Sequence, residues 1–502
     1  MIVLYKSTRG YEKLVSSSYA IINGLAEDKG LYVPFKIHKL KNSLEYLAGL
    51  PYEELAFCIL KEFLDDFCDD DLRDCIYKAY DKKFEDNKIL QIKSISNTHF
   101  LELYHGPTLA FKDVALCLFP YLLNKALINN KQKENILILT ATSGDTGKAA
   151  LEGFSDIPRI KIAVLYPKDG TSLIQKLQMI THRSNNSLVI SLNGNFDDAQ
   201  NCIKNILNDS KIKKEFNDNG FILSSANSIN IGRLFPQIVY YFYAYGNLLN
   251  KNIIKHNEKI NIVVPTGNFG NILSAYYAKK LGLPINKLIC ASNENNVLFD
   301  FINTGIYDRR RILKVTNSPS MDILISSNLE RLLYDLSNED SILIKNLMNF
   351  LEIQGFYEIP KSLKEKLNEI FYSDFATEKE SINAINKVYK NFNYLIDPHT
   401  AVAYSVYEKY KEKTKDKTQT IIASTASPFK FPKTILQGLD VNTSNINDIE
   451  ALNILSKKTT LPIPTSLKNL DKKPIIHNNI CPKDKVLQAI ENFAHIGGDL
   501  LD

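Results

Sequence analysis

The sequence predicts an α/β fold in which parallel sheets are covered by helices on both faces. Short runs of apolar residues alternate with helical patterns, and a polar turn commonly follows a run. The runs lie at 136–139, 161–166, 187–192, 261–264, 288–291 and 420–423. Strands that are apolar throughout are typical of parallel sheets buried on both sides. Because ligands bind beyond the carboxyl ends of such strands, we expect the functional residues in the polar turns.

The chain of 502 residues is too long for a single hydrophobic core, so several domains are expected. Residues 1–95 have helical patterns, and we interpret them as an N-terminal domain. Residues 96–436 hold the alternating apolar runs and form the expected core. Residues 437–502 begin with a stretch rich in Asn, Ser, Thr and Pro. We expect them to pack on the core as a loop-rich segment that closes with a helix at 483–493.

The composition argues against nucleic-acid binding and membrane insertion. A net charge of +5 is small for a chain of this length and does not predict a basic surface for nucleic acid. The longest apolar stretch, at 238–249, is far short of the roughly 20 residues that a membrane span needs. The first residues form too short an apolar run for a signal peptide. The 7 cysteines lack paired spacing, which predicts free thiols in a reducing compartment, no metal site and a cytoplasmic protein.

Lys112 follows the apolar residues Leu109, Ala110 and Phe111 in a turn-rich segment. Loss of solvent disfavours an ammonium ion and frees the amine to act as a nucleophile. A Schiff base with pyridoxal phosphate requires such an amine. A single lysine is more often a surface charge, so this interpretation depends on the other turns.

A glycine-containing turn follows the strand at 261–264 and precedes a helical pattern at 272–281. Its glycines let several N–H groups point the same way, and a helix N-terminus adds the positive end of its dipole. The turn therefore predicts a cradle for a phosphate monoester, with a plain strand–helix connection as the alternative. Its residues are Gly267, Asn268, Phe269, Gly270 and Asn271.

A second turn follows the strand at 136–139 and opens a helix near Gly147. Hydroxyl and N–H groups at a helix start suit a carboxylate, and an ordinary N-cap is the alternative. Its residues are Ser143, Gly144, Asp145, Thr146 and Gly147.

A third turn, at 224–233, contains Asn227 and ends in Arg233 before an aromatic-rich helix. The guanidinium of Arg233 suits a second phosphate group. Tyr240 and Tyr241 in that helix are expected to be packing residues.

Two further turns complete the set. Thr425 follows the last apolar run. Its hydroxyl can form a hydrogen bond with a ring nitrogen without placing a charge beside it. A plain Ser/Thr turn is the alternative. Asp397 is predicted to cap a helix that has Pro398 at its first position. We interpret His399 as structural rather than catalytic.

In this order along the chain, the motifs resemble the threonine synthase family, in the tryptophan-synthase-β-like class of pyridoxal phosphate enzymes. The likeness spans nearly the whole chain, with Lys29 standing where the family usually has glycine. The motifs are 7–10, 24–34, 105–113, 143–147, 166–167 with Gln175 and Gln178, 224–233, 265–271, 318–322 with 326–328, 397–402 and 425–431.

The resemblance implies a two-lobed core of parallel sheets with an added N-terminal domain. It implies the conversion of O-phospho-L-homoserine and water to L-threonine and phosphate, the last step of threonine biosynthesis, in a monomer or a homodimer. Lys112 would carry the Schiff base and move protons during the reaction.

The resemblance also implies a binding role for each turn. Residues 267–271 would hold the cofactor phosphate, and Thr425 would face the pyridine nitrogen. Residues 143–147 would bind the substrate carboxylate. Arg233 and Asn227, with the neighbouring serines, would bind the substrate phosphate.

Other functions remain as alternatives. A threonine dehydratase of the same class shares the lysine and the phosphate turn but has no need of a second phosphate site. A phospho-lyase keeps both phosphate sites and differs only in the fate of the intermediate. A non-catalytic cofactor-binding protein would have no need of a substrate carboxylate site.

Overall fold

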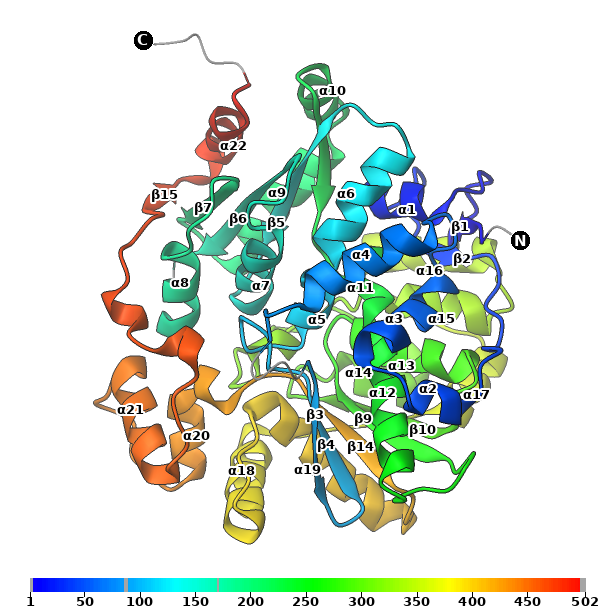
Figure 1. Cartoon of the computed structure of the whole chain (residues 1–502), viewed down its shortest axis with the longest axis vertical. Helices are drawn as coiled ribbons and strands as arrows, with labels where there is room; N and C mark the ends of the chain where they lie inside the picture. Colours follow the sequence, from blue (N-terminus) through cyan, green and yellow to red (C-terminus); the bar gives the residue numbers. More distant parts are fainter. Residues whose placement is uncertain (1–2, 85–88, 169–170, 497–502) are drawn as a thin grey trace.

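The computed structural model describes residues 3–84, 89–168 and 171–496, which form two lobes, each built on its own sheet (Figure 1). The sheet of the larger lobe has the strand order β13-β10-β9-β14-β4-β3, and only β3 pairs antiparallel. Its strands are β3 Gln91–Ile95, β4 Thr98–Glu102, β9 Ile260–Pro265, β10 Ile285–Ser292, β13 Phe371–Phe375 and β14 Thr420–Ser424. The predicted runs at 261–264, 288–291 and 420–423 are thus confirmed as strands of one sheet.

The sheet of the second lobe lies at the upper left of Figure 1 and has the order β15-β7-β6-β5-β8, with every pair parallel. Its strands are β5 Asn135–Ala141, β6 Ile160–Pro167, β7 Ser187–Leu192, β8 Phe221–Ser225 and β15 Asn479–Cys481. The runs at 136–139, 161–166 and 187–192 are its three central strands. The prediction of parallel sheets in an α/β fold is confirmed.

Both faces of each sheet are buried, which explains why the strands are apolar throughout. In β9, Ile262 and Val264 lie in one hydrophobic cluster, whereas Val263 lies in another on the opposite face. Helix α13 (Gly270–Lys280) packs on β9 and β10, and so does α19 (Pro398–Thr414). Because successive side chains of a strand point to opposite faces, a strand between two helical layers must be apolar at every position.

The N-terminal residues share a core with the two lobes. Strands β1 (Tyr5–Ser7) and β2 (Tyr32–Pro34) form an antiparallel pair. The helices that follow pack against helices from later in the chain, α1 on α6 and both α2 and α3 on α12. The helices are α1 Ser17–Asn23, α2 Leu44–Ala48, α3 Tyr52–Lys61, α4 Asp69–Tyr80, α6 Phe119–Asn129 and α12 Pro236–Asn250.

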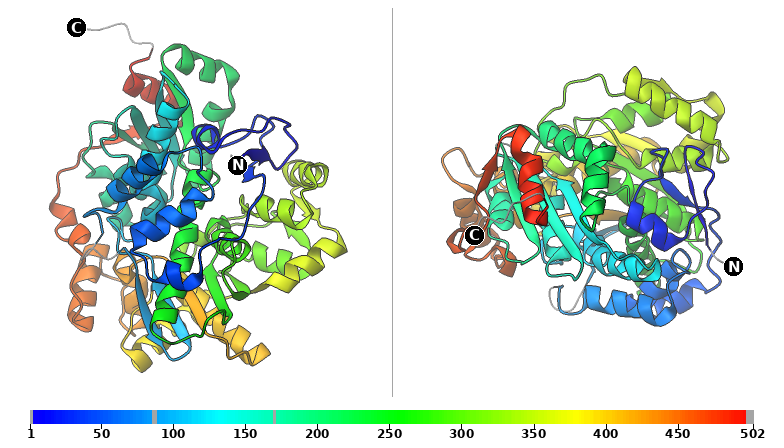
Figure 2. Two further views of the ribbon diagram at one scale, coloured as in Figure 1. Left: turned by 45° about the vertical axis from the view of Figure 1, so that its right-hand side comes forward. Right: turned by 90° about the horizontal axis from the view of Figure 1, so that it is seen from above.

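The C-terminal segment contacts both lobes. Helix α20 (Pro432–Gly438) packs on α18 (Glu378–Phe392) of the larger lobe, and α21 (Asp448–Thr459) packs on α20. The chain then runs to the second lobe, where β15 joins the sheet and α22 (Val486–Ala494) packs beside it (Figure 2). The closing helix predicted at 483–493 is α22 with a short 3₁₀ turn, Lys483–Lys485, before it.

The remaining elements connect these parts. They are α5 Lys112–Leu116, α7 Asp145–Phe154, α8 Leu173–Ile180, α9 Phe196–Asn208, α10 Ser210–Asp218, α11 Ile231–Leu234, α14 Val297–Thr304, β11 Ile306–Asp308, α15 Leu329–Leu336, α16 Ser341–Ile353, β12 Phe356–Glu358 and α17 Lys361–Ile370. Short 3₁₀ turns include Pro319–Met321, Pro428–Lys430, Thr465–Leu467 and Leu470–Lys472.

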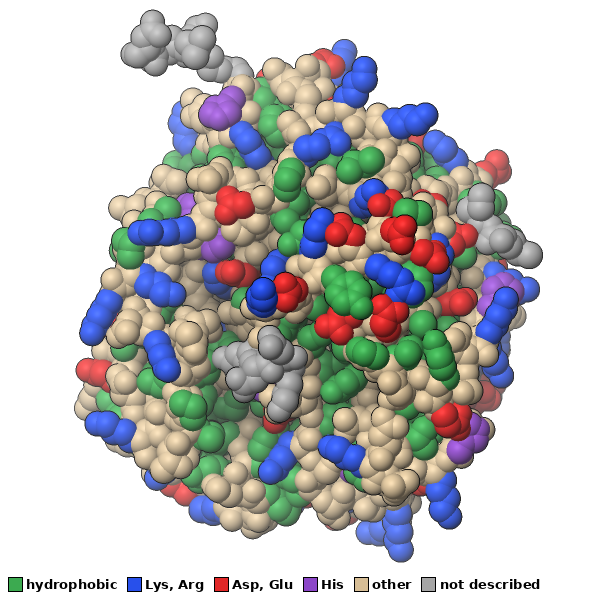
Figure 3. All heavy atoms as spheres, in the orientation of Figure 1, with side chains coloured by type: hydrophobic (Ala, Val, Ile, Leu, Met, Phe, Trp, Pro, Cys, Tyr) green, Lys and Arg blue, Asp and Glu red, His purple; other side chains and the backbone are tan. Residues whose placement is uncertain are grey.

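The surface shown in Figure 3 has lysine and arginine side chains interspersed with acidic ones, as the small net charge predicts. All 7 cysteines are free thiols. Within the described ranges, every helix is too short or too polar to cross a membrane.

Candidate active site

Lys112 is the first residue of α5 and lies beside the carboxyl end of β14. The segment before it is tied to the residues after β14 by backbone hydrogen bonds. The N–H of Phe111 donates to the carbonyl of Thr425 (2.8 Å), and the N–H of Ser427 donates to the carbonyl of Leu109 (3.0 Å). The fold thereby places Thr425 next to the predicted Schiff-base lysine, at the sheet edge where ligands of α/β proteins bind.

The surroundings of Lys112 favour its neutral amine. The side chain is half-buried, and Nζ donates a hydrogen bond to Ser320 Oγ (3.4 Å). Burial lowers the pKa of Lys112, and the nearby cations of Arg233 and Lys430 act in the same direction, so that the pKa falls from 10.5 to about 8. Asp145 and Asp113 oppose that shift. With a pKa of about 8, about one amine in ten is neutral at pH 7, compared with about one in 3000 at the ordinary value of 10.5.

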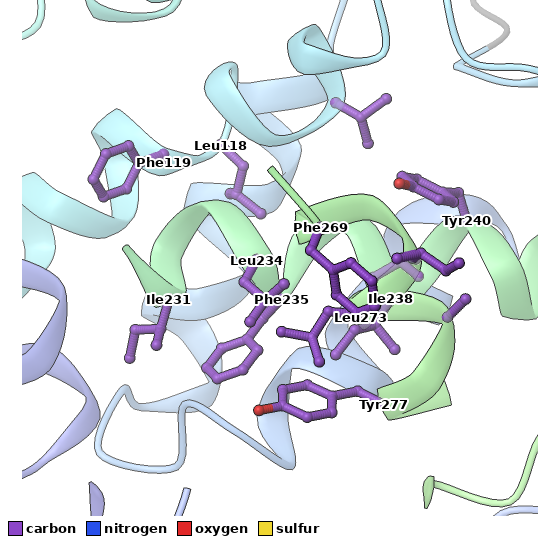
Figure 4. Packing of buried hydrophobic residues seen from close by; sticks show 14 of the residues in the cluster. Leu118, Phe119, Ile231, Leu234, Phe235, Ile238, Tyr240, Phe269, Leu273 and Tyr277 are labelled. Carbon is purple, nitrogen blue, oxygen red and sulfur yellow. The ribbon is translucent and has the colours of Figure 1, made fainter. Parts of the chain in front are cut away.

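The glycine turn connects β9 to α13 and presents free N–H groups. Among the described residues, no acceptor is found for the backbone N–H groups of residues 267–272, at the positive end of the α13 dipole. Phe269 adopts a left-handed backbone conformation (φ 63°), which turns the chain into the helix. Its side chain is buried among Leu234, Ile238 and Leu273, so the core below anchors the turn (Figure 4).

Asn271 has a fixed orientation in this turn. Its Oδ1 accepts hydrogen bonds from the hydroxyl groups of Tyr240 (2.8 Å) and Tyr241. The opposite atom, Nδ2, is buried and has no partner within the described ranges. A buried donor without a partner is costly in a protein, so it marks a place where an anion fits. Tyr240 and Tyr241, predicted as packing residues, therefore also orient a polar group of the turn.

The glycine at 267 is required by close packing, whereas the one at 270 is not. A Cβ atom at Gly267 would come within 2.7 Å of the Ser320 carbonyl oxygen. At Gly270 the nearest atom, Asn328 Nδ2, would be 3.5 Å away, which is an ordinary contact. The two positions therefore form a matched pair for substitution.

We expect Gly267→Ala to lower the free energy of unfolding by about 1–3 kcal/mol and to weaken anion binding, because the backbone must shift to relieve the clash. Gly270→Ala should change the free energy of unfolding by less than about 0.5 kcal/mol. Thermal unfolding with and without added pyridoxal phosphate measures both effects. Equal behaviour of the two variants would contradict the packing account.

The turn at 143–147 follows β5 in the second lobe. The hydroxyl of Thr142 accepts from the N–H groups of Gly144 and Gly147, both at 2.9 Å. The N–H groups of Ser143, Asp145 and Thr146 have no acceptor among the described residues, so they remain available to a carboxylate. Gly144 has φ 149°, and a Cβ atom there would overlap the side chain of Gln175.

The Asp145 side chain points away from solvent into an ion pair. Its Oδ1 lies 2.6 Å from Lys430 Nζ and accepts from Gln175 Nε2 (2.8 Å). Its Oδ2 accepts from Ser320 Oγ (3.3 Å). The sequence alone predicts no role for Lys430 or Ser320, and the only signal for one is that they lie in the motifs 425–431 and 318–322.

Arg233 is a buried cation with few partners. It is 3% exposed, and Nη1 donates to the carbonyl of Ala226 (2.7 Å), but Nε has no partner within the described ranges. No carboxylate among the described residues forms an ion pair with it, and burial lowers its pKa to about 10. Because an uncompensated buried charge is unfavourable, this guanidinium suits an anionic ligand.

The other residues of the predicted site differ in exposure. Asn227 is exposed, and its side chain makes no hydrogen bond to another described residue. His399 is buried, with Nδ1 2.8 Å from Asp397 Oδ1, and its Nε2 accepts from the N–H of Ser320 (3.2 Å). His399 thus supports the loop that carries Ser320, in keeping with a structural role.

Two family models and many relatives match the chain. The model described as Threonine synthase N terminus matches residues 4–80, and that described as Threonine synthase, C-terminal matches residues 400–490. A Saccharomyces cerevisiae protein named Threonine synthase is 38% identical over 465 residues, covering 87% of this chain and 89% of that protein. A Homo sapiens protein named Threonine synthase-like 1 is 42% identical over 466 residues, covering 90% of this chain. The match spans 62% of the human protein's length.

The structure is similar to solved structures over its whole length. The crystal structure of a Brucella melitensis threonine synthase with bound pyridoxal phosphate has a TM-score of 0.86 and 32% sequence identity. The alignment covers 99% of this chain and 100% of that chain.

Proposed function

Because this chain belongs to the threonine synthase family, we propose that it binds pyridoxal 5'-phosphate and converts O-phospho-L-homoserine and water to L-threonine and phosphate. The observation that carries the proposal is the position of Lys112, a lysine with a lowered pKa that has Thr425 and the buried cation Arg233 close by. We further propose that the protein is cytoplasmic and acts as a monomer or a homodimer.

The residues present fit the cofactor. The free N–H groups of the glycine turn and the unpartnered Nδ2 of Asn271 suit its phosphate. Nζ of Lys112 suits its aldehyde, and the hydroxyl of Thr425 suits its ring nitrogen. When bound, pyridoxal phosphate supplies an electron sink for negative charge at the substrate Cα.

The substrate has one group for each remaining feature. Its carboxylate would accept from the free N–H groups of Ser143, Asp145 and Thr146. Its phosphate would pair with Arg233. The phosphate would supply the negative charge that the buried guanidinium lacks in the protein alone. Asn227 is exposed, so we propose it only as a rim contact.

Lys112 would move the protons. The amine takes a proton from Cα and assists proton loss at Cβ, after which the Cγ–O bond breaks and phosphate leaves. Water then adds its oxygen at Cβ and gives up one proton, while Cγ and Cα each take up a proton, which replaces the two that were lost from Cα and Cβ. The neutral fraction of Lys112 at pH 7 makes this role feasible, because only the free amine accepts a proton.

The test is to incubate the purified protein with O-phospho-L-homoserine and to measure phosphate and amino-acid products together. Threonine formed in step with phosphate supports the proposal. Phosphate with 2-oxobutyrate in place of threonine would instead mean a phospho-lyase. Release of neither product by protein loaded with pyridoxal phosphate would overturn the substrate assignment.

A further inference from the structure

The buried Lys430 and the half-buried Lys112 lie near one buried carboxylate, that of Asp145. Asp145 is 4% exposed and comes from the second lobe, whereas Lys430 is 1% exposed and follows β14 of the larger lobe. Their ion pair, at 2.6 Å, therefore crosses between the lobes. Lys430 Nζ also donates to the carbonyl of Thr108 (2.9 Å), in the segment that leads to Lys112.

Among the described residues, the hydrogen bonds that connect Lys112 to the same carboxylate pass through a hydroxyl. Its Nζ donates to Ser320 Oγ (3.4 Å), and Ser320 Oγ donates to Asp145 Oδ2 (3.3 Å). Oδ1 is already taken by Lys430 and Gln175. One carboxylate compensates the charge of one buried ammonium well, so the lysine that binds it directly leaves the other lysine with little compensation.

The other charged groups near Lys112 do not alter this arrangement. Asp113, on the same helix α5, accepts from the N–H (2.9 Å) and the hydroxyl of Thr108, and burial raises its pKa to about 6. Arg233, on α11, adds a positive charge. Among the described residues, Asp145 on α7 and Lys430 after β14 are the other charged groups with a large effect on Lys112.

We propose that Lys430 is a positioning residue that occupies the Asp145 carboxylate and thereby leaves Lys112 as a neutral amine. The consequence for catalysis rests on the proposed function, but the effect on Lys112 does not. Because the ion pair joins the two lobes, the amine state of Lys112 also depends on the lobes being together. The lowered pKa of Lys112, to about 8, is in keeping with this arrangement.

The test follows the acetylation of Lys112 by acetic anhydride as a function of pH, in the full-length chain freed of pyridoxal phosphate. Peptide mass spectrometry gives the rate at Lys112 alone, and the midpoint of its pH dependence is expected near 8 for the unaltered chain. Lys430→Met should raise the midpoint by about one unit, because Asp145 is then left to the Lys112 ammonium. Asp145→Asn should lower the midpoint, because Lys430 then lies near Lys112 without its counter-ion.

The double variant Lys430→Met with Asp145→Asn distinguishes this electrostatic effect from a nonspecific structural change around Lys112. Its midpoint should lie within about half a unit of the unaltered chain, because the two charges are removed together. A rise in the double variant equal to that of Lys430→Met would overturn the inference. Lys430→Arg keeps the cation, so it should leave the midpoint of Lys112 unchanged. Lys433→Met removes a half-exposed lysine of α20 and should also leave that midpoint unchanged.

Thermal unfolding shows whether each variant is folded. If Lys430→Met does not fold, Asp145→Asn decides: a lowered midpoint supports the inference and an unchanged one overturns it. A chain that makes threonine but whose midpoints do not move would overturn this inference alone. A chain that releases neither product from O-phospho-L-homoserine, yet shows the expected midpoints, would overturn only the proposed function.

Discussion

Replacing Lys112 by alanine is expected to lower the turnover of O-phospho-L-homoserine by at least about 10³-fold. The expected loss is large because the substitution removes both the amine that would hold the cofactor and the proton carrier, and positioned acid–base groups alone contribute about 10²–10⁴. Lys112→Arg should be equally inactive, since a guanidinium keeps the positive charge but does not become a free amine near neutral pH. Parallel assays of phosphate and threonine measure the effect.

The control is Lys433→Arg, a change at a lysine of α20 that is 40% exposed and whose Nζ lies 3.8 Å from Asp448 Oδ1. It should retain full activity. Borohydride treatment of the loaded protein, followed by peptide mass spectrometry, should leave the mass of the reduced cofactor on the peptide that contains Lys112. Attachment at another lysine would contradict the assignment, whatever the activity of the variants.

Replacing Arg233 by methionine is expected to lower kcat/KM by about 100-fold with little change in stability. A charge-assisted hydrogen bond to phosphate is worth about 2–3 kcal/mol, which is the source of the loss. Within the described ranges, the guanidinium donates to the Ala226 carbonyl, and its Nε has no partner. Relief of an uncompensated buried charge should offset that lost hydrogen bond to within about 1 kcal/mol.

Arg331 provides a matched control, because it is also buried but each of its three guanidinium nitrogens donates a hydrogen bond. Its guanidinium donates to the carbonyls of Tyr32 (3.0 Å) and Ile229 and to Asn328 Oδ1 (2.5 Å). Arg331→Met leaves three acceptors without a donor, so it should lower the free energy of unfolding by about 3 kcal/mol or more. Denaturant unfolding of both variants, with kcat/KM and product inhibition by inorganic phosphate, tests the contrast. Equal destabilisation by the two changes would contradict the view that the Arg233 guanidinium binds an anionic ligand rather than stabilising the fold.

The strands that the sequence predicts correctly are those buried on both faces. Every residue of β9, for example, is buried, so the apolar run is visible without any partner. The inner strand β4 and the edge strands β3, β8, β13 and β15 were not predicted. Strand β3 is half-exposed and carries Lys93 and Ser94, and β15 has only three residues, so neither gives a clear pattern. The boundary of the N-terminal domain at residue 95 stays a prediction.

The sequence predicts the turns of the site because each follows a strand, and the topology then brings those strand ends together. It does not predict the ion pair between Asp145 and Lys430, because these residues come from different lobes and meet only in the folded chain. The same holds for the hydroxyls of Tyr240 and Tyr241 on Asn271, which look like packing residues in an aromatic helix. Polar contacts between residues that are far apart in the sequence produce no local pattern, so the sequence alone does not predict them.

The most direct test of the proposed reaction is to run it in water enriched in ¹⁸O and to locate the label by mass spectrometry. Cleavage of the Cγ–O bond and addition of water at Cβ predict one ¹⁸O in the hydroxyl of threonine and none in the phosphate. Label in the phosphate, with unlabelled homoserine as the other product, would show attack of water on phosphorus and would contradict the account.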